Sequence, residues 1–382
     1  MKYKDIIKDI IDNFASKHCH FYVKKSKSEI DKYIDEELEK GYVNCEEDLA
    51  FFVRKVIKES LGEYDSHTRF KRKERYMPFR FKFLKDGFYV ISSDSGFEHF
   101  NFAKLISING VSIDTLYSEI EEATCYSTVE HLYSEAENIL SRTDVFLLPS
   151  VAKDHLTYEL EIDGKKELIT VNKEDSYENK MKGKQNYGFF CENDTLILTY
   201  NSCSDIDKMM ETVSAIKEII EKNNIQNFVL DLRGNDGGNS MVIMPLIDYL
   251  KTSNLNIVTL VDRYVFSSGR WAVKEMEGLN SYFIGENLCT SLNCFGENMS
   301  YKYTTNESLY SIAVSIKYFG FDKDGNLTSL DPDKIDYKHL DFQFFSPNLY
   351  VNETIDDYKN HKDPYLDATY SYLENLRKSS RD

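Results

Sequence analysis

The chain has 382 residues and carries 47 lysines and arginines against 64 aspartates and glutamates, a formal net charge of −17. At roughly 150 residues per domain, this length corresponds to two or three domains. Hydrophobic residues make up 41% of the chain, enough for more than one packed core, which excludes a fully disordered protein. The acidity argues against nucleic acid as the main partner, because phosphate binding needs clustered lysines and arginines.

Cysteine spacing, the N-terminal residues and the histidines bear on location and cofactors. The seven cysteines show no CxxC spacing, which favours reduced thiols in a reducing compartment over a disulfide framework. The N-terminus has no apolar signal segment, and no apolar run approaches the roughly 20 residues of a membrane span. His18 and His20 alone have a spacing typical of metal ligands, and we interpret them as exposed helix-end residues. We expect a cytoplasmic protein without membrane contact, metal or cofactor, unless a leader has been removed.

The first 61 residues have the apolar spacing of helices. Ile7, Ile10 and Phe14 recur at helical intervals, and residues 49–57 repeat the pattern. A basic cluster follows at 69–75. We interpret this cluster as a solvated loop, with a dedicated carboxylate-binding patch as the alternative.

From Met77 the pattern changes to an alternation of apolar and polar residues, which indicates strands. Asp-Gly at 86–87 and Asn-Gly at 109–110 are dipeptides that join hairpin strands. Strands around one or two helices predict a small α+β module over 76–175, and a polar linker at 172–185 bounds it. The expected elements after the first hairpin are strands at 104–108, 111–113, 156–162 and 167–171 and a helix at 114–123.

The third region alternates strands and helices, which predicts a mainly parallel sheet with its reactive groups at the strand C-termini. A proline at 364, after an aspartate, predicts the start of a C-terminal helix that runs to about 376. The expected strands are 195–200, 228–232, 257–261, 282–284 and 311–318, and the expected helices are 206–222, 241–250 and 267–276.

A glycine-rich segment, DLRGNDGG at 231–238, directly follows a buried strand. Its three glycines let the chain turn sharply and bring backbone N–H groups close to a bound atom, as in an oxyanion hole or phosphate cradle. It is neither a P-loop nor a dinucleotide fingerprint. By itself the segment is also compatible with an ordinary turn between strand and helix.

A second segment, VFSSGR at 265–270, places two serines between a strand and a helix. A hydroxyl group there meets the positive end of the helix dipole, which suits a nucleophile. A simple helix-capping role for Ser267 or Ser268 is the alternative.

The two segments together resemble peptidase family S41, the tail-specific proteases. Further matches occur in the family's order: a DxHT-like element at 65–68, PDZ-like segments at 76–79, 87–90 and 105–110, a "GE" strand end at 284–286, a "PD" turn at 331–333 and a helix start at 363–366. The matches span about 65–370. The resemblance implies an α/β fold with a ClpP/crotonase-like core at 186–345, a PDZ-like module at 76–175, a helical N-terminal region at 1–70 and a C-terminal tail at 346–382.

The same resemblance implies a catalytic machinery. Ser267 is the expected nucleophile, and the N–H groups of Ser268 and of Gly237 or Gly238 are the expected oxyanion hole. A Ser–Lys dyad is disfavoured, because the stretch 285–292 has no lysine and Lys274 lies roughly 10 Å from Ser267 along a helix axis.

The other branch of the family, with tricorn-type and chlamydial members, takes its base from the DxHT element, which points to His67. The expected acid is Asp331, with Asp65 and Glu286 as alternatives. Asp is one methylene shorter than the Glu usual in that branch, so Asp331 could orient His67 only if the backbone compensates.

These residues predict a serine endopeptidase that binds an extended polypeptide along a sheet edge and forms an acyl-enzyme on Ser267. Two other classes stay open. A catalytically inactive S41-like protein would keep the fold and bind peptides. A crotonase-type acyl-CoA enzyme would share the core but would not need the DxHT element or a PDZ-like module.

Overall fold

The computed structural model describes residues 3–63, 65–73, 75–178, 186–305, 307–340 and 342–379. The chain forms two compact units. Unit 1 consists of Met1–Lys180 and Asn293–Phe342, and unit 2 consists of Met181–Leu292 and Gln343–Asp382. The family resemblance in the sequence implies a single core over all of 186–345. The structure instead places 293–342 in unit 1, because strands of this segment pair with a strand near the N-terminus.

Unit 1 begins with the helices expected over the first 61 residues, α1 (Lys4–Lys17), α2 (Lys27–Glu39) and α3 (Glu46–Leu61). Their apolar faces are buried in one cluster. Helix α2 begins with a capping box, in which Ser26 Oγ accepts from the Glu29 N–H and Glu29 Oε2 accepts from the Ser26 N–H at 2.8 Å. The box satisfies two N–H groups that a helix start leaves without a partner.

The basic cluster is a strand rather than a loop over β1 (Arg69–Arg72). Phe70 is buried and stacks on Tyr310, with 4.4 Å between ring centroids. Because side chains alternate along a strand, burying Phe70 directs Arg69 and Lys71 to the opposite face. The loop interpretation is therefore wrong at 69–72. With only one apolar residue among the cations, this segment shows no alternation of apolar and polar residues that would indicate a strand.

A four-stranded sheet contains β1. Strand β14 (Leu309–Phe321) lies between β1 and β13 (Cys294–Thr304), and β15 (Leu327–Leu330) also pairs with β14. All these pairings are antiparallel. The strand expected at 311–318 therefore exists, but it does not belong to the parallel sheet that its position in the sequence suggested.

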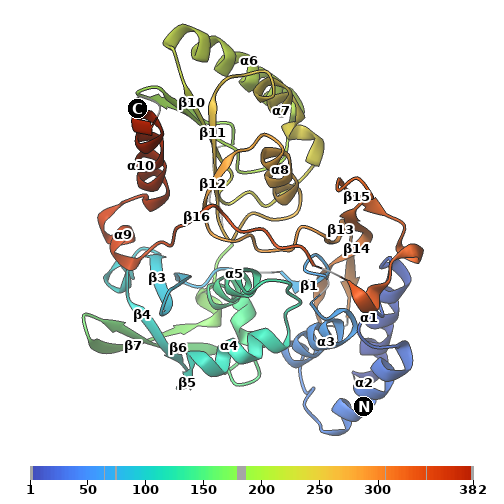
Figure 1. Cartoon of the computed structure of the whole chain (residues 1–382). Helices are drawn as coiled ribbons and strands as arrows, with labels where there is room; N and C mark the ends of the chain where they lie inside the picture. Colours follow the sequence, from blue (N-terminus) through green and yellow to red (C-terminus); the bar gives the residue numbers. More distant parts are fainter. Residues whose placement is uncertain are drawn as a thin grey trace. The chain divides into compact units, whose positions relative to one another are not determined.

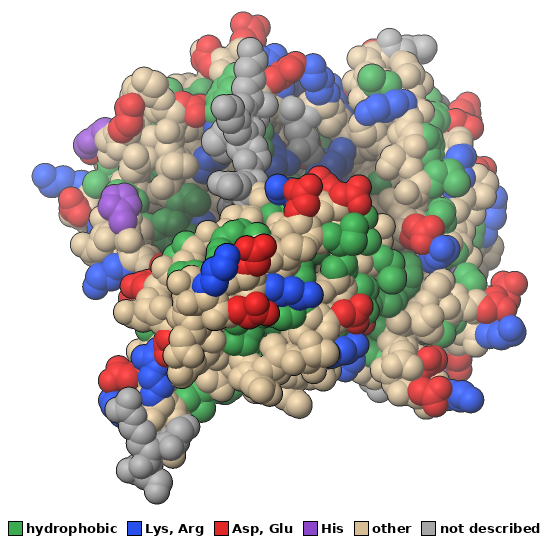
Figure 2. All heavy atoms as spheres, turned by 90° about the horizontal axis from the view of Figure 1, so that it is seen from above, with side chains coloured by type: hydrophobic (Ala, Val, Ile, Leu, Met, Phe, Trp, Pro, Cys, Tyr) green, Lys and Arg blue, Asp and Glu red, His purple; other side chains and the backbone are tan. Residues whose placement is uncertain are grey.

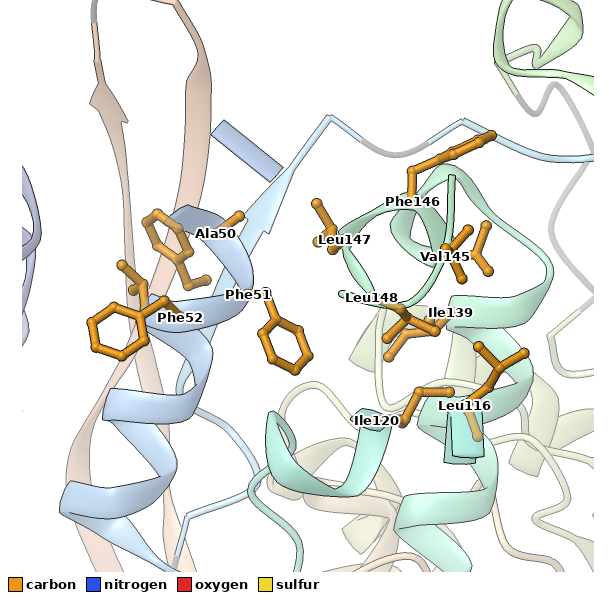
Figure 3. Packing of buried hydrophobic residues seen from close by; sticks show 14 of the residues in the cluster. Ala50, Phe51, Phe52, Leu116, Ile120, Ile139, Val145, Phe146, Leu147 and Leu148 are labelled. Carbon is orange, nitrogen blue, oxygen red and sulfur yellow. The ribbon is translucent and has the colours of Figure 1, made fainter. Parts of the chain in front are cut away.

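The second sheet of unit 1 follows the order β2-β3-β4-β6-β7, with β5 beside β4. The Asp-Gly and Asn-Gly turns lie where the sequence placed them, between β2 and β3 and between β4 and β5. Figure 3 shows apolar side chains of α3, α4, α5 and the 143–148 segment that belong to one buried cluster. The elements are β2 (Phe79–Leu84), β3 (Gly87–Ser93), β4 (Lys104–Ile108), β5 (Val111–Ser112), α4 (Ile113–Glu122), α5 (Val129–Leu140), β6 (His155–Ile162) and β7 (Lys165–Asn172). Part of the expected linker, 179–185, lies outside the described residues.

Unit 2 is built on a six-stranded sheet of order β16-β12-β11-β10-β9-β8 (Figure 1). Pairings from β9 to β16 are parallel and β8 is antiparallel, so the predicted parallel strands at 195–284 are confirmed. Helix α10 packs Tyr365 and Leu373 against the sheet. The strands are β8 (Phe189–Glu192), β9 (Thr195–Thr199), β10 (Asn227–Asp231), β11 (Asn256–Val261), β12 (Tyr282–Gly285) and β16 (Leu349–Tyr350), and the helices are α6 (Ile206–Asn223), α7 (Met244–Leu250), α8 (Ser268–Glu277), α9 (Ile355–Asn360) and α10 (Pro364–Ser379).

The described helices are all too short or too polar to cross a membrane. Figure 2 shows a face on which acidic and basic side chains are interspersed with apolar ones. The excess of acidic residues is therefore not gathered into one patch on this face.

Replacing Phe70 tests how firmly β1 is seated on the core. We expect Phe70→Ala to lower the free energy of unfolding by about 3–5 kcal/mol, because it empties a buried aromatic site. Urea unfolding followed by circular dichroism measures the change. The control Leu168→Ala removes a side chain that is 72% exposed and should change the free energy by less than about 0.5 kcal/mol. Equal losses in the two variants would contradict the buried position of Phe70.

Candidate active site

Ser267 has a strained backbone conformation at the start of a helix in unit 2. The chain leaves β11, turns, and enters α8 with Ser267 as its N-cap residue. Ser267 has φ 52° and ψ −120°, a region that costs a non-glycine residue roughly 1–3 kcal/mol. A strained turn from strand to helix holds a serine side chain in one fixed direction, which suits a nucleophile.

The glycine-rich segment packs directly against this serine. Because β10 and β11 are parallel neighbours, the turns that follow them meet at one edge of the sheet. A Cβ atom added to Gly237 would lie 2.6 Å from Ser267 Cβ and 2.8 Å from the Ser268 nitrogen. Gly237 also has φ +98°. Only glycine fits here, for steric and conformational reasons alike.

Asn235, to which the sequence analysis gave no role, holds the glycine turn together. Its side chain is fully buried, and its Nδ2 donates to the Tyr200 carbonyl at 2.7 Å. Its Oδ1 accepts from the Gly237 N–H at 2.9 Å, and its carbonyl accepts from the Phe266 N–H at 2.9 Å. The Gly237 N–H is therefore engaged by Asn235. Of the donors expected for an oxyanion hole, Gly238 and Ser268 are the better candidates.

Cys203 was also missed as part of this site. Its N–H donates to the Gly237 carbonyl at 2.8 Å and its own carbonyl accepts from the Asn239 N–H at 2.8 Å. A Cβ atom on Gly238 would lie 2.3 Å from the Cys203 oxygen, so the two backbones touch. Burial raises the pKa of the Cys203 thiol to about 11, which keeps it protonated. Cys203 thus braces the turn and is not an alternative nucleophile.

The neighbouring Ser268 is used structurally through its side chain. Ser268 Oγ donates to the Gly238 carbonyl at 2.7 Å and lies 2.9 Å from Ser240 Oγ. These bonds fasten the first turn of α8 to the glycine segment. Ser267 is therefore the serine of the pair whose side chain suits a chemical role.

Two charged groups considered for catalysis in unit 2 have cationic or anionic partners of their own. Glu286, an alternative acid, is buried with Arg263, and Arg263 Nε lies 3.2 Å from Glu286 Oε1. Lys274 is partly exposed and forms an ion pair with Glu277 at 3.0 Å. The Glu286–Arg263 pair joins the segments that follow β12 and β11, and the Lys274–Glu277 pair lies within α8.

His67 lies in unit 1, directly before β1, and is buried. Its ring packs near β13, since a Cβ atom on Gly296 would lie 3.8 Å from His67 Cε1. The His67 carbonyl accepts from Asn298 Nδ2 at 3.2 Å. The backbone at His67 is therefore tied to β13.

Asp65 organises the segment around His67. Its Oδ1 accepts from the N–H groups of His67 at 2.7 Å and Thr68 at 3.0 Å and from Ser315 Oγ at 3.0 Å. Its Oδ2 accepts from Thr68 Oγ1 at 2.5 Å and lies 2.8 Å from His18 Nε2. Burial opposes ionisation of Asp65, but the hydrogen bond from His18 and the nearby charges of His18 and His67 hold its pKa well below the usual range.

The interpretation of His18 as an exposed residue is wrong. His18 is buried at the end of α1, and its Nδ1 accepts from the His20 N–H at 2.9 Å. Since Nδ1 is an acceptor, the proton of a neutral ring is on Nε2 and is donated to Asp65. His20 is exposed and stacks on Tyr337, with 4.0 Å between centroids. The apolar spacing in the sequence predicts helix α1 but gives no information on whether His18, the residue that ends it, is buried.

Asp331, the expected acid, lies in unit 1 at the start of a 3₁₀ turn, Pro332–Lys334. Its Oδ1 accepts from the Asp333 N–H at 3.2 Å, and its Oδ2 pairs with Lys334 at 2.9 Å. The hydrogen bond from Lys334 lowers the pKa of Asp331. The charge of His67 is among the causes that lower the pKa of Asp65, so these two groups interact electrostatically.

Comparisons with known proteins rest on structure. No family model matches the sequence, and no curated protein matches it either. A crystal structure of mature CPAF matches with a TM-score of 0.62 at 9% identity, covering 98% of this chain and 96% of CPAF. Mature CPAF complexed with lactacystin matches with 0.60 at 10% identity, covering 99% and 97%. The photosystem II D1 C-terminal processing protease matches with 0.44 at 12% identity, covering 92% and 94%. The chain thus has the mixed α/β fold of CPAF, and at this identity the likeness concerns the fold alone.

Gly237→Ala tests the close approach to Ser267. Gly96 has a similar φ of +92° but nothing within 4 Å of an added Cβ atom, so Gly96→Ala isolates the conformational cost of about 1–2 kcal/mol. We expect Gly237→Ala to cost at least about 1 kcal/mol more, because neighbouring backbone must shift as well. Chemical unfolding measures both variants. Equal costs would show that Gly237 has room for a side chain.

Asp65→Asn tests the buried carboxylate through pH. The folded-state pKa of Asp65 is lowered, so its ionised form contributes stability above the unfolded-state pKa of about 3.9 and loses it as pH falls towards the folded value. We expect Asp65→Asn to be less stable than wild type at pH 7, and the difference to shrink below about pH 4. Urea unfolding across pH measures this, with Asp324→Asn in an exposed turn as the control. A pH-independent difference would contradict an ionised Asp65.

Proposed function

We propose that the protein is a serine endopeptidase of the S41 type, with Ser267 as nucleophile and His67 as general base. The observation that carries the proposal is the backbone at Ser267, which has a positive φ at the start of α8 and touches the glycine turn. The motif order in the sequence and the CPAF-like fold support the same conclusion.

In the proposed reaction, Ser267 Oγ attacks the scissile carbonyl while His67 takes its proton. The oxyanion that forms is stabilised by the N–H groups of Gly238 and Ser268. His67 then returns the proton to the leaving amine, and water hydrolyses the acyl-enzyme by the same steps in reverse. A single oxyanion donor of this kind contributes on the order of 10²–10³ in rate.

For the acid we propose electrostatic support from Asp65 beside the original candidate, Asp331. The Asp65 carboxylate fixes the backbone at His67 and lies near enough for the two charges to interact. Its oxygens already accept five bonds. We therefore assign Asp65 a positioning role, and Asp331 would have to leave Lys334 before it could serve His67.

A catalytically inactive peptide-binding protein is the second candidate. The observation in its favour is that Asp331 and Glu286 are both paired with cations next to them. The crotonase-type alternative has less support, because it assigns no use to the buried network around His67.

A fluorophosphonate probe distinguishes the two candidates. We expect labelling of the wild type, none of Ser267→Ala, and at least about 100-fold slower labelling of His67→Ala, because a general base contributes that much. Ser214→Ala, on the exposed surface of α6, is the control and should label like wild type. Mass spectrometry locates the label.

Two results would count against the peptidase. An unlabelled, folded wild type would favour the binding protein. Normal labelling of His67→Ala combined with slow labelling of Lys274→Ala would transfer the base to Lys274.

A further inference from the structure

The outer face of the sheet formed by β1, β14 and β13 is hollowed. The cavity has a volume of about 460 Å³. It is lined by side chains from all three strands, which we call the sheet groove: Arg69, Lys71, Ser300, Lys302, Ser311 and Ala313.

The strand register explains its shape. One row across the sheet joins Arg69 to Ala313 and Ala313 to Ser300, and the next joins Lys71 to Ser311 and Ser311 to Lys302. The middle strand therefore presents small side chains, whereas β1 carries Arg69 and Lys71 and β13 carries Ser300 and Lys302. A floor of small residues between cationic rims leaves room for another chain.

The groove is lined by cations although the protein as a whole is strongly acidic. Of the described residues that line it, three are cations and none is acidic. Arg69 lies 3.9 Å from Glu135 of α5, and the charges of both Lys71 and Arg69 act on Glu135, so this carboxylate is shared by two of the three cations. Lys302 donates to Ser311 Oγ and is exposed. The charged residues that line the groove are thus cations, in a chain whose formal charge is −17.

One end of the groove adjoins His67. Arg69 follows His67 by two residues on the way into β1, and Ser300 follows Asn298 by two residues along β13. Asn298 Nδ2 and the His67 carbonyl are joined by a hydrogen bond. Asn298 and Ser300 lie on β13, where side chains two residues apart share a face and are about 7 Å apart. A chain lying in the groove would therefore approach the proposed general base.

We propose that the sheet groove binds an acidic segment of the polypeptide substrate, with the pattern acidic-x-acidic in extended conformation. The alternate side chains of an extended peptide are spaced like the two cationic rows, so each carboxylate meets a cation in its own row. The carboxylate-binding interpretation of the basic cluster at 69–75 thus gains a structural basis. This inference rests on the proposed function for the identity of the ligand as substrate, but binding to the groove does not need catalysis.

Binding is measured on Ser267→Ala, so that turnover does not interfere. Fluorescence anisotropy compares a labelled ten-residue peptide containing Glu-Ser-Glu with the same peptide containing Gln-Ser-Gln. We expect the acidic peptide to bind about 5- to 10-fold more tightly at low salt, as two exposed ion pairs allow. Half-molar salt should abolish the preference, because the groove is open to solvent.

Matched charge variants locate the binding. Lys302→Gln and Lys71→Gln should each weaken the acidic peptide about threefold and leave the neutral peptide unchanged. Lys323→Gln, in the exposed turn between β14 and β15, removes the same charge and should have no effect. Circular dichroism confirms that each variant is folded.

Three results would overturn the proposal: no preference for the acidic peptide, equal losses in Lys323→Gln and Lys302→Gln, or a single-stranded oligonucleotide that binds as tightly through Lys302. The last result would mark a general anion site. Failure of the peptidase is separable from failure of the groove. A wild type that resists the fluorophosphonate probe while Ser267→Ala keeps the acidic preference would refute only the peptidase.

Discussion

The contact between Gly237 and Ser267 is the constraint on which the arrangement of unit 2 depends. A Cβ atom on Gly237 would lie only 2.6 Å from Ser267 Cβ. The turn after β10 and the turn after β11 are therefore in direct contact, and neither can move without the other. Asn235, Cys203 and Ser268 each add a hydrogen bond that keeps the two turns in place. The strained φ of Ser267 persists because this surrounding network over-determines it. A fold that only needed a loop there would have no reason to hold a serine in that conformation.

Asp65 is the residue on which the arrangement of unit 1 depends. Its effect comes from a buried charge and its hydrogen bonds, whereas that of Gly237 comes from a steric contact. A carboxylate without access to solvent is costly unless hydrogen bonds satisfy it, and Asp65 receives them from His18, Thr68, Ser315 and the His67 backbone. These donors come from α1, from the segment before β1 and from β14. The charge therefore joins three parts of the chain that are distant in sequence. It also means that His67 cannot shift without disturbing the core.

The sequence was informative where local pattern and fold agree. The apolar run of β10, the glycine turn and the start of α10 at Pro364 lie as predicted. It failed where tertiary contacts decide. Strand β13 has few apolar residues in its exposed half, and β1 has only Phe70 to mark its buried face. Asn235 and Cys203 act through backbone groups of distant residues. No spacing rule could have identified them, although an asparagine inside a glycine turn is a residue that caps its own backbone.

The net charge argues against nucleic acid as the main partner but points to no substrate, because a sum over the chain carries no information on position. The sheet pairing supplies that position. Cations at 69, 71 and 302 are scattered in the sequence, and the register of β1, β14 and β13 brings them to one face. The charged residues that line the groove are then opposite in sign to the total, and repulsion from distant acidic residues is largely screened because the Debye length at physiological salt is only about 8 Å. An acidic segment would be repelled weakly by the protein as a whole and attracted at the groove. The distribution of charge would therefore determine both which segments bind and where they bind.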